Sequence, residues 1–444
     1  MTERSPRANA GALLVLSLSL AALAALCAAL RIPMADALVY RAEGAAVANG
    51  TSLYGFTVTS WHLPATYPPF AALVFVPSAF VPLPVLKVAC CVGNTALLAV
   101  LVLLSCRLAG LRPRRHHALV AVALGLWLEP VFQTLLFGQV NLALACLVLW
   151  DLSRPAHAPD NGFGKGFGNG FGKGLGKRFG KVFGKGFGVG IAAGIKITPL
   201  FFVLYLLVRG RRQEAVTALA GFGTTMLLGA LVLPRASVEF FTRRLFETGR
   251  VGKAWIVDNQ SLQGLIARSL HTAEPGAVWA VAAVAVGAAG LWTARRADEP
   301  RALLAAAFTA LLISPISWSH HWVWCVPLIA VLWAEGRTRT AVAVALVFTA
   351  RSLWLVPHAG ALDLQLPLWQ QPLASPYALV GLAVMGWAGW TARQSFAAGA
   401  APTSGEVRSG PSGPGRNGPS GEGPLDASPA GQLSARSSSA SMIR

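Results

Sequence analysis

Residues 34–70, MADALVYRAEGAAVANGTSLYGFTVTSWHLPATYPPF, form the first polar interruption after an apolar N-terminal segment. They place an acidic side chain, Asp36, just after a run that is long enough to cross a membrane. A carboxylate at a membrane boundary costs free energy unless it faces a partner or a water-filled cavity. The stretch therefore indicates a membrane fold in which the rest of the chain builds a cavity around Asp36.

The composition supports a membrane fold. The chain has 444 residues, of which 54% are hydrophobic and only 12% are charged, whereas a soluble domain carries about 25% charged residues. We therefore predict an all-α polytopic membrane protein. The net charge of +19 is assigned to cytoplasmic turns, where Lys and Arg collect, so no nucleic-acid partner is expected.

The cysteines give no sign of a metal or redox centre. All six lie in or beside apolar runs, without the paired spacings of a zinc site or a disulfide framework. We read them as small buried residues, and we expect neither a metal ion nor a cofactor.

The hydropathy pattern predicts about 11–13 membrane segments. Residues 11–30 are expected to form an uncleaved first helix, and Arg4 and Arg7 before it place the N-terminus in the cytoplasm. Further spans are expected at 85–106, 118–137, 142–152, 215–233, 276–293, 302–313, 322–334, 341–355 and 374–391. The apolar runs 70–80, 187–195 and 200–208 are too short to cross a bilayer alone, so they are expected to be short or re-entrant helices.

These segments are expected to make one transmembrane catalytic domain over residues 1–393. It contains a low-complexity insert of Gly, Phe and Lys at residues 153–186, expected in the cytoplasm and outside any helix because glycine is so frequent. Residues 394–444 are rich in Ser, Gly and Pro and are expected to be a disordered tail.

Turns rich in Lys and Arg alternate along the chain with turns rich in Asp, His, Asn, Gln, Trp and Tyr. Since the basic turns are cytoplasmic, the other set, with every polar motif of interest, is expected on the extracytoplasmic side of the plasma membrane. Besides Asp36, the acids on that side are Glu43, Glu239, Glu247, Asp258, Glu274 and Asp363.

Asp36 is the candidate catalytic residue. The sequence contains neither a Cys/His nucleophile pair nor a Ser-centred elbow, so a lone carboxylate suits a general base better than a covalent nucleophile. The alternative is a structural carboxylate at the N-cap of a helix that begins ALVYRA.

Two further motifs supply an aromatic group and a cation. Tyr67 precedes two prolines that fix the chain direction, and together with Tyr40 it offers phenolic hydroxyls, unless the motif is only a rigid turn. Lys196 interrupts two short apolar helices in the sequence KITP. It suits either a phosphate-pairing cation at a broken helix or a lysine that snorkels to the interface.

His320 and His321 can donate hydrogen bonds to a phosphate or a sugar. Because adjacent helical residues point to different faces, at most one of them is expected in a shared cavity. Interfacial packing among the neighbouring tryptophans is the alternative. Polar or aromatic residues that suit sugar contacts, unless they are merely solvated loop residues, are Gln139, Asn141, Asn259, Gln260 and Trp318.

Taken in order, seven motifs resemble glycosyltransferase family 87 of the GT-C superfamily. They are D-x-x-V-Y from Asp36, L-Y-G from Leu53, T-Y-P-P-F from Thr66, G-Q-V-N from Gly138, I-K-I-T-P from Ile195, N-Q-S-L from Asn259 and S-P-I-S-W-S-H-H-W from Ser314. The set spans the chain from about Asp36 to Trp324. The insert and the tail lie outside the pattern.

The resemblance implies a GT-C fold and a catalytic base in the first outer loop, carried here by Asp36. It also implies that the histidine pair lines the active site. The implied donor is polyprenyl-phosphate mannose, and the implied reaction is transfer with inversion, in an α-1,2 linkage, to a phosphatidylinositol mannoside or related lipoglycan.

The rival hypothesis is a lipid or solute transporter in which Asp36 and Lys196 serve ion coupling. Transporters usually show inverted internal repeats, and this sequence shows none.

Overall fold

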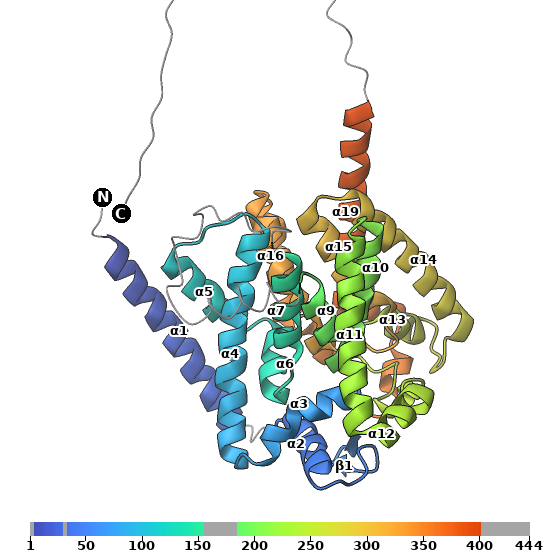
Figure 1. Cartoon of the computed structure of the whole chain (residues 1–444). Coiled ribbons are helices and arrows are strands. Elements are labelled where there is room, and N and C mark those ends of the chain that lie inside the picture. Colours follow the sequence, from blue (N-terminus) through green and yellow to red (C-terminus); the bar gives the residue numbers. More distant parts are fainter. Residues whose placement is uncertain (1–3, 30–32, 155–183, 401–444) are drawn as a thin grey trace, which may run out of the picture. The chain divides into compact units, whose positions relative to one another are not determined.

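The computed structural model describes residues 4–29, 33–154 and 184–400. Most of the expected Gly/Phe/Lys insert and of the expected disordered tail lies outside the described residues. Helices dominate the described part of the chain (Figure 1), which confirms the predicted all-α class. The exception there is a small antiparallel hairpin of β1 (Thr57–Val58) and β2 (Leu63–Pro64).

Four helices of the described residues are long and apolar enough to cross a membrane: α1 (Arg4–Ala29), α4 (Leu83–Leu108), α11 (Arg212–Val232) and α14 (Gly276–Arg296). Their outer faces are apolar, since Val88, Leu231 and Val284 are each more than 60% exposed. Exposed aliphatic faces on long helices suit contact with lipid. The predicted multi-pass membrane protein is thus confirmed.

Two further candidate spans are bent. A single continuous span was expected over 118–137, and this is wrong. The segment consists of two helices, α5 (Arg115–Gly125) and α6 (Glu129–Phe137), at an angle of 71°. Pro130 lies in the first turn of α6, where its missing N–H leaves no helical bond unmade. The other bend, of 81°, separates η7 (Leu368–Gln370) and α18 (Gln371–Ala374) from α19 (Pro376–Ala400).

The predicted short helices are present. They are α3 (Pro69–Ala79), α7 (Asn141–Leu152), α9 (Phe187–Ile195) and, after a turn of 3-10 helix η1 (Thr198–Leu200), α10 (Phe201–Val208). Lys196 has an extended backbone (φ −145°, ψ 127°), so the chain is broken where KITP predicted a break. Pro199 starts the next helix within its first two positions.

The remaining elements complete the bundle and its loops. The expected outer loop at 234–275 holds α12 (Pro234–Glu239), η2 (Phe240–Arg244), η3 (Thr248–Arg250) and α13 (Leu262–Ser269). The later chain forms α15 (Glu299–Ile313), η4 (Ser319–Trp324), α16 (Cys325–Ala334), α17 (Thr338–Ala350), η5 (Ser352–Trp354) and η6 (Leu362–Gln365).

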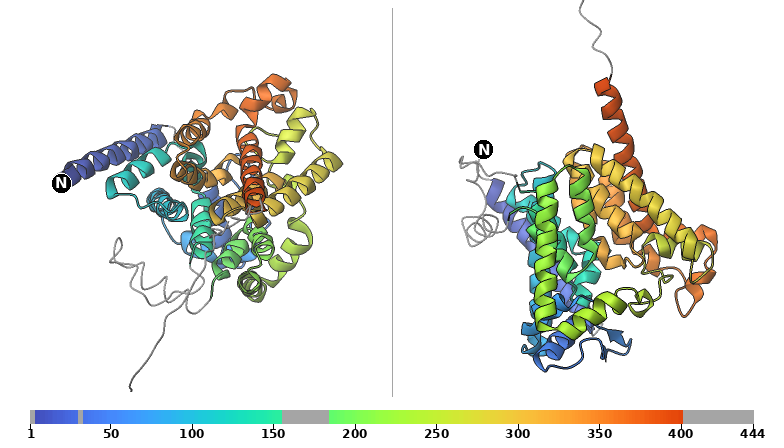
Figure 2. Two further views of the ribbon diagram at one scale, coloured as in Figure 1. Left: turned by 90° about the horizontal axis from the view of Figure 1, so that it is seen from above. Right: turned by 45° about the vertical axis from the view of Figure 1, so that its right-hand side comes forward.

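A helix within the first polar loop, α2 (Ala35–Ala48), lies beside α3, the hairpin and α12 at one end of α11 (Figures 1 and 2). Sequence analysis treated this region as a loop. Gly44 lets α2 approach α3 closely, since a Cβ atom there would lie 2.4 Å from the carbonyl oxygen of Phe75. We call α2, α3 and the hairpin the cap; it has its own small apolar clusters around Tyr54 and Phe75.

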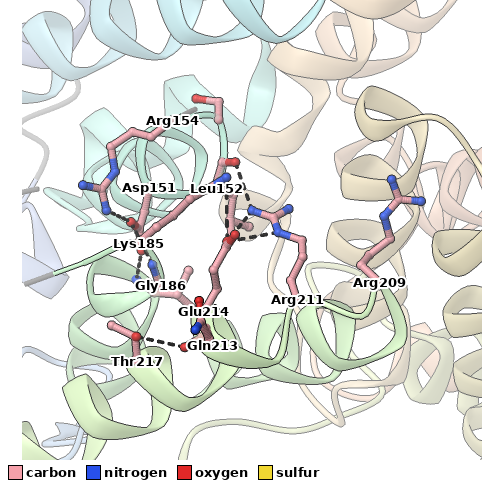
Figure 3. A network of polar contacts seen from close by, with 12 residues as sticks. Asp151, Leu152, Arg154, Lys185, Gly186, Arg209, Arg211, Gln213, Glu214 and Thr217 are labelled. Carbon is pink, nitrogen blue, oxygen red and sulfur yellow. Dashed lines mark hydrogen bonds and ion pairs between the residues drawn. The ribbon is translucent and has the colours of Figure 1, made fainter. Parts of the chain in front are cut away.

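A polar network holds the turns at the other ends of α7, α9 and α11 (Figure 3). The Asp151 carboxylate accepts hydrogen bonds from the backbone N–H groups of Gly186 (3.1 Å) and Val189 (3.0 Å), and it pairs with Arg154. Glu214 pairs with Arg211 at 2.5 Å and with Lys185 at 3.7 Å. This network fixes the start of α9, and the end of α9 carries Lys196.

Candidate active site

A cavity of about 1120 Å³ lies between the cap and the loops after α11 and α15. Its polar lining includes Asp36, Tyr40, Tyr67, Gln139, Lys196, Asp258, Trp318, His320 and His321. These residues come from six separate parts of the chain. The structure therefore brings together most of the site residues that the sequence predicted.

Asp36 lies in the first turn of α2. Met34, with a left-handed backbone, occupies the N-cap position and makes no side-chain cap bond, so the alternative of Asp36 as the N-cap is wrong. Burial raises the pKa of Asp36 to about 6, and the nearby Asp258 charge raises it further, while a hydrogen bond from Gln139 and the charge of Lys196 act to lower it. A carboxyl group that titrates near neutrality in a cavity suits proton transfer.

Gln139 is fixed by two tyrosines. The hydroxyl groups of Tyr40 and Tyr67 donate to Gln139 Oε1 at 2.7 Å and 3.2 Å. Since Oε1 is occupied in this way, the amide Nε2 is the atom left to donate to Asp36. Tyr67 is itself held, because Tyr54 donates to its backbone carbonyl at 2.9 Å.

Gly138 explains how Gln139 reaches Asp36. Its φ of +69° ends α6, and a Cβ atom at this position would lie 2.7 Å from the Cβ of Ala37. The turn can approach α2 this closely only with glycine. The motif G-Q-V-N thus places an amide beside the carboxylate.

Lys196 also lines the cavity and has two polar partners. Its Nζ donates to Asn141 Oδ1 at 3.1 Å and lies 2.9 Å from His321 Nε2. Because an ammonium group only donates, His321 Nε2 accepts this bond when Lys196 is charged. Lys196 also lies 5.4 Å from the centre of the Tyr67 ring, so this cation does not snorkel away from the site.

Both histidines line the cavity, so the expectation that at most one of them would do so is wrong. The two residues lie in the 3-10 helix η4, and their rings meet edge to face with centres 4.7 Å apart, so both reach the same space. His320 packs against Phe137, at 5.5 Å between ring centres, and its carbonyl accepts from Asn141 Nδ2 at 3.1 Å.

Asn259 and Gln260 do not line the cavity. Both are fully buried, and their side chains bond the backbone. Asn259 Oδ1 accepts from Ser317 N at 2.8 Å, and Gln260 Nε2 donates to the carbonyls of Val257 (2.6 Å) and Ala374 (2.8 Å). They hold the loop in place rather than reach the space where a substrate fits.

The neighbouring Asp258 does line the cavity, and its Oδ1 accepts from Ser319 N at 3.1 Å. Sequence analysis placed Asp258 on the same side of the membrane as Asp36 but gave it no role. Its only sequence signal is an acid directly before N-Q-S. Trp318 also lines the cavity, close to Gly252.

Within the described ranges, no group of three or more His, Cys, Asp or Glu side chains is arranged to hold a metal ion. The lining instead combines a buried carboxylate, a Lys–His pair and apolar walls.

Known proteins match most of this chain. A polyprenol-phosphate-mannose-dependent alpha-(1-2)-phosphatidylinositol mannoside mannosyltransferase of Mycobacterium tuberculosis is 32% identical over 338 residues, which cover 71% of this chain and 74% of the relative. A pentamannoside mannosyltransferase of that type from the same species is 31% identical and covers 79% of this chain and 80% of the relative. A phosphatidylinositol mannoside mannosyltransferase of Mycolicibacterium smegmatis is 30% identical, with 75% and 74% covered.

No solved structure matches the chain. Residues 65–315 match glycosyltransferase family 87, which is more than half of the sequence and includes every lining segment from Tyr67 to Asp258. Together with the relatives, this match identifies the chain as a membrane glycosyltransferase that belongs to glycosyltransferase family 87.

Proposed function

We propose that this protein transfers mannose from polyprenyl-phosphate mannose to a phosphatidylinositol mannoside or related lipoglycan, with inversion and in an α-1,2 linkage. The observation that carries the proposal is that one cavity joins three features: the Asp36 carboxylate, the Lys196–His321 pair and an apolar wall. The names of the relatives support mannose as the sugar and phosphatidylinositol mannosides as the acceptors.

The apolar wall suits a lipid-linked donor. Phe201 and Leu204 of α10, Leu219 of α11 and Ile313 of α15 line the cavity beside the Lys196 break. Leu204 and Leu219 are also 45% and 48% exposed. We infer that a prenyl chain lies along this wall, where each buried CH₂ would contribute about 0.8 kcal/mol.

The polar groups suit activation of the acceptor hydroxyl and stabilisation of the departing phosphate. Asp36 removes the proton from the acceptor hydroxyl, whose oxygen attacks the anomeric carbon of the donor. The bond from that carbon to the phosphate oxygen breaks, and its electron pair leaves with the polyprenyl phosphate. Lys196 and His321 stabilise the phosphate charge by charge-assisted hydrogen bonds.

The supporting residues make this arrangement rigid. Gln139 orients the Asp36 carboxylate, and Tyr40 and Tyr67 hold Gln139. Asn141 holds both Lys196 and the His320 backbone. A preorganised set of donors stabilises the developing charge without having to move during the reaction.

We place the reaction on the extracytoplasmic side of the plasma membrane. The support is the charge pattern: the Arg-rich network lies at the start of α9, and Lys196 with the cavity lies at its end. Nucleotide sugars stay in the cytoplasm, so a transferase on the outer side needs a donor that carries its own lipid.

The test is a reconstituted assay with purified protein in lipid vesicles. Labelled polyprenyl-phosphate mannose and phosphatidylinositol mannosides of defined length are supplied, and the product linkage is determined by methylation analysis. We expect an α-1,2-linked mannose on one acceptor. Movement of a lipid or solute across the vesicle without sugar transfer would instead support the transporter hypothesis, which the relatives do not favour.

A further inference from the structure

Asp258 lines the cavity from the loop that joins η3 to α13. It precedes α13 in the loop that follows η3, and its Oδ1 accepts a hydrogen bond from Ser319 N, directly before the two histidines. The loop is held rigidly, because the next two side chains, Asn259 and Gln260, bond the backbone on both sides of it. The carboxylate is thus fixed at the cavity rather than free to turn away.

The position of Asp258 relates it to both ends of the proposed reaction. Through Ser319 it adjoins His320 and His321, which lie on the leaving-group side with Lys196. It is also close enough to Asp36 for its charge to help raise the pKa of Asp36. Since the anomeric carbon must lie between the attacking oxygen and the departing phosphate, the sugar ring lies in the space that Asp258 faces.

We propose that Asp258 binds the hydroxyl groups of the transferred hexose and so helps select the donor sugar. This inference rests on the proposed function and adds the residue that recognises the sugar. An ionised carboxylate accepts hydrogen bonds at two oxygens and donates none, so it suits a pair of neighbouring hydroxyls. Ser319 already bonds this carboxylate through its backbone N–H and through its side chain, which leaves the remaining lone pairs of the two oxygens for the substrate.

Trp318 provides a flat apolar wall beside this carboxylate. Its ring is held against Gly252, where a Cβ atom would lie 2.8 Å from the indole. The combination of a carboxylate edge and an aromatic face suits a hexose, which has hydroxyls at its rim and C–H groups on its faces.

The alternative is that Asp258 only positions the histidine turn through Ser319. Asp258→Asn separates the two roles, because the amide oxygen still accepts from Ser319 N while the charge is lost. Gln260→Leu is the control: Gln260 also holds this loop, through bonds to the carbonyls of Val257 (2.6 Å) and Ala374 (2.8 Å), and it does not line the cavity. The control should lower the melting temperature of the protein more than it changes the recognition of the sugar.

The experiment measures kcat and KM of the full-length protein with polyprenyl-phosphate mannose and with a series of donors that each lack one hydroxyl. Wild type should discriminate against one or two of the deoxy donors by roughly 10- to 100-fold in kcat/KM, the effect of a lost charge-assisted hydrogen bond. Asp258→Asn should raise KM for the mannose donor and lose that discrimination, while Gln260→Leu keeps it.

Asp258→Asn with wild-type KM, or with wild-type discrimination against every deoxy donor, would overturn the inference. If the Asn variant does not accumulate, Asp258→Glu serves instead. Its displaced carboxylate should also weaken the discrimination, and unchanged discrimination would contradict the proposal. A wild-type protein that transfers no sugar from any donor is a different result, because it refutes the proposed function itself.

Discussion

Carboxylates near the two ends of α9 differ in whether they form ion pairs. At its start, the network around Asp151, Glu214 and Glu299 pairs every carboxylate with an arginine. In the cavity at its end, Asp36 and Asp258 have no ion pair within 4 Å among the described residues, and the nearby Glu43 in the cap also has none. Burial raises the pKa of Glu43 to about 8, the opposite of what an arginine partner would do.

The difference separates carboxylates that stabilise the fold from carboxylates that can take part in the reaction. Carboxylates paired with arginine hold turns together. Carboxylates held by amides and backbone N–H groups in a cavity keep a proton affinity that a substrate can use. The contrast predicts that mutations at the two ends fail in different ways.

The largest effect is expected from Asp36→Asn. Loss of a general base lowers kcat by about 10²–10⁴-fold, and the isosteric amide should leave expression and melting temperature close to wild type. The measurement is the transfer assay with labelled donor, next to thermal unfolding in detergent. Asp298→Asn, in an exposed turn, is the control and should keep full activity. Turnover of Asp36→Asn within threefold of wild type would remove Asp36 from the mechanism.

The next effect is expected from Lys196→Met. The methionine keeps the apolar stem but removes the cation, so kcat/KM should fall by about 10- to 100-fold, the worth of a hydrogen bond to a charged group. Lys185→Met, which removes the cation beside Glu214 at the other end of α9, should change activity little. Equal losses in the two variants would contradict the division between the two ends.

The dependence of kcat/KM on pH should report the protonation of Asp36. Its pKa is raised to about 6 by burial, and the groups that face it are Lys196, Asp258, Tyr40, Tyr67 and Glu43. A base acts only when deprotonated, so kcat/KM should fall about tenfold per pH unit below this pKa. Burial lowers the pKa of Lys196 to about 7, so kcat/KM should fall again above that pH, where the cation loses its proton. Asp258→Asn removes a like charge and should move the acidic limb to lower pH. A flat profile between pH 5 and 8 would argue against a titrating base.

The smallest effect on activity is expected from Asp151→Asn, with a clear effect on stability. The buried carboxylate caps the start of α9 and pairs with Arg154, so its loss should destabilise the protein by about 1.5–3 kcal/mol. Thermal unfolding should show a lower melting temperature, while kcat at low temperature stays within a few fold of wild type. A loss of kcat without a loss of stability would contradict a purely stabilising role for Asp151.

The sequence predicted much of this arrangement. Hydropathy located the long helices, and Pro199 with Lys196 located the break, because both signals are local. The motif residues Asp36, Gln139, Lys196 and His321 do meet in one cavity. Their convergence followed from placing all the polar turns on one side of a membrane.

Features set by tertiary packing were not predicted. Whether Asp258 or its neighbours Asn259 and Gln260 face the cavity depends on contacts with Ser317 and Ala374, which are distant in sequence. The bend before Glu129 and the 3-10 form of η4 likewise depend on packing. The helix α2 left one readable signal, a run of 14 residues without proline; it was interpreted as loop, and a helix there entered only in the alternative of an N-cap before ALVYRA.

The polar network has one more consequence. Arg154 donates to the carbonyl oxygen of Gly184 at 2.9 Å, and Asp151 binds the N–H of Gly186, so residues 154 and 184 are joined directly in the fold. Doubling the length of a closed loop costs only about 0.6 kcal/mol. A fluorescent domain could therefore be inserted between residues 154 and 184 in place of residues 155–183. It would label the enzyme without displacing Lys196.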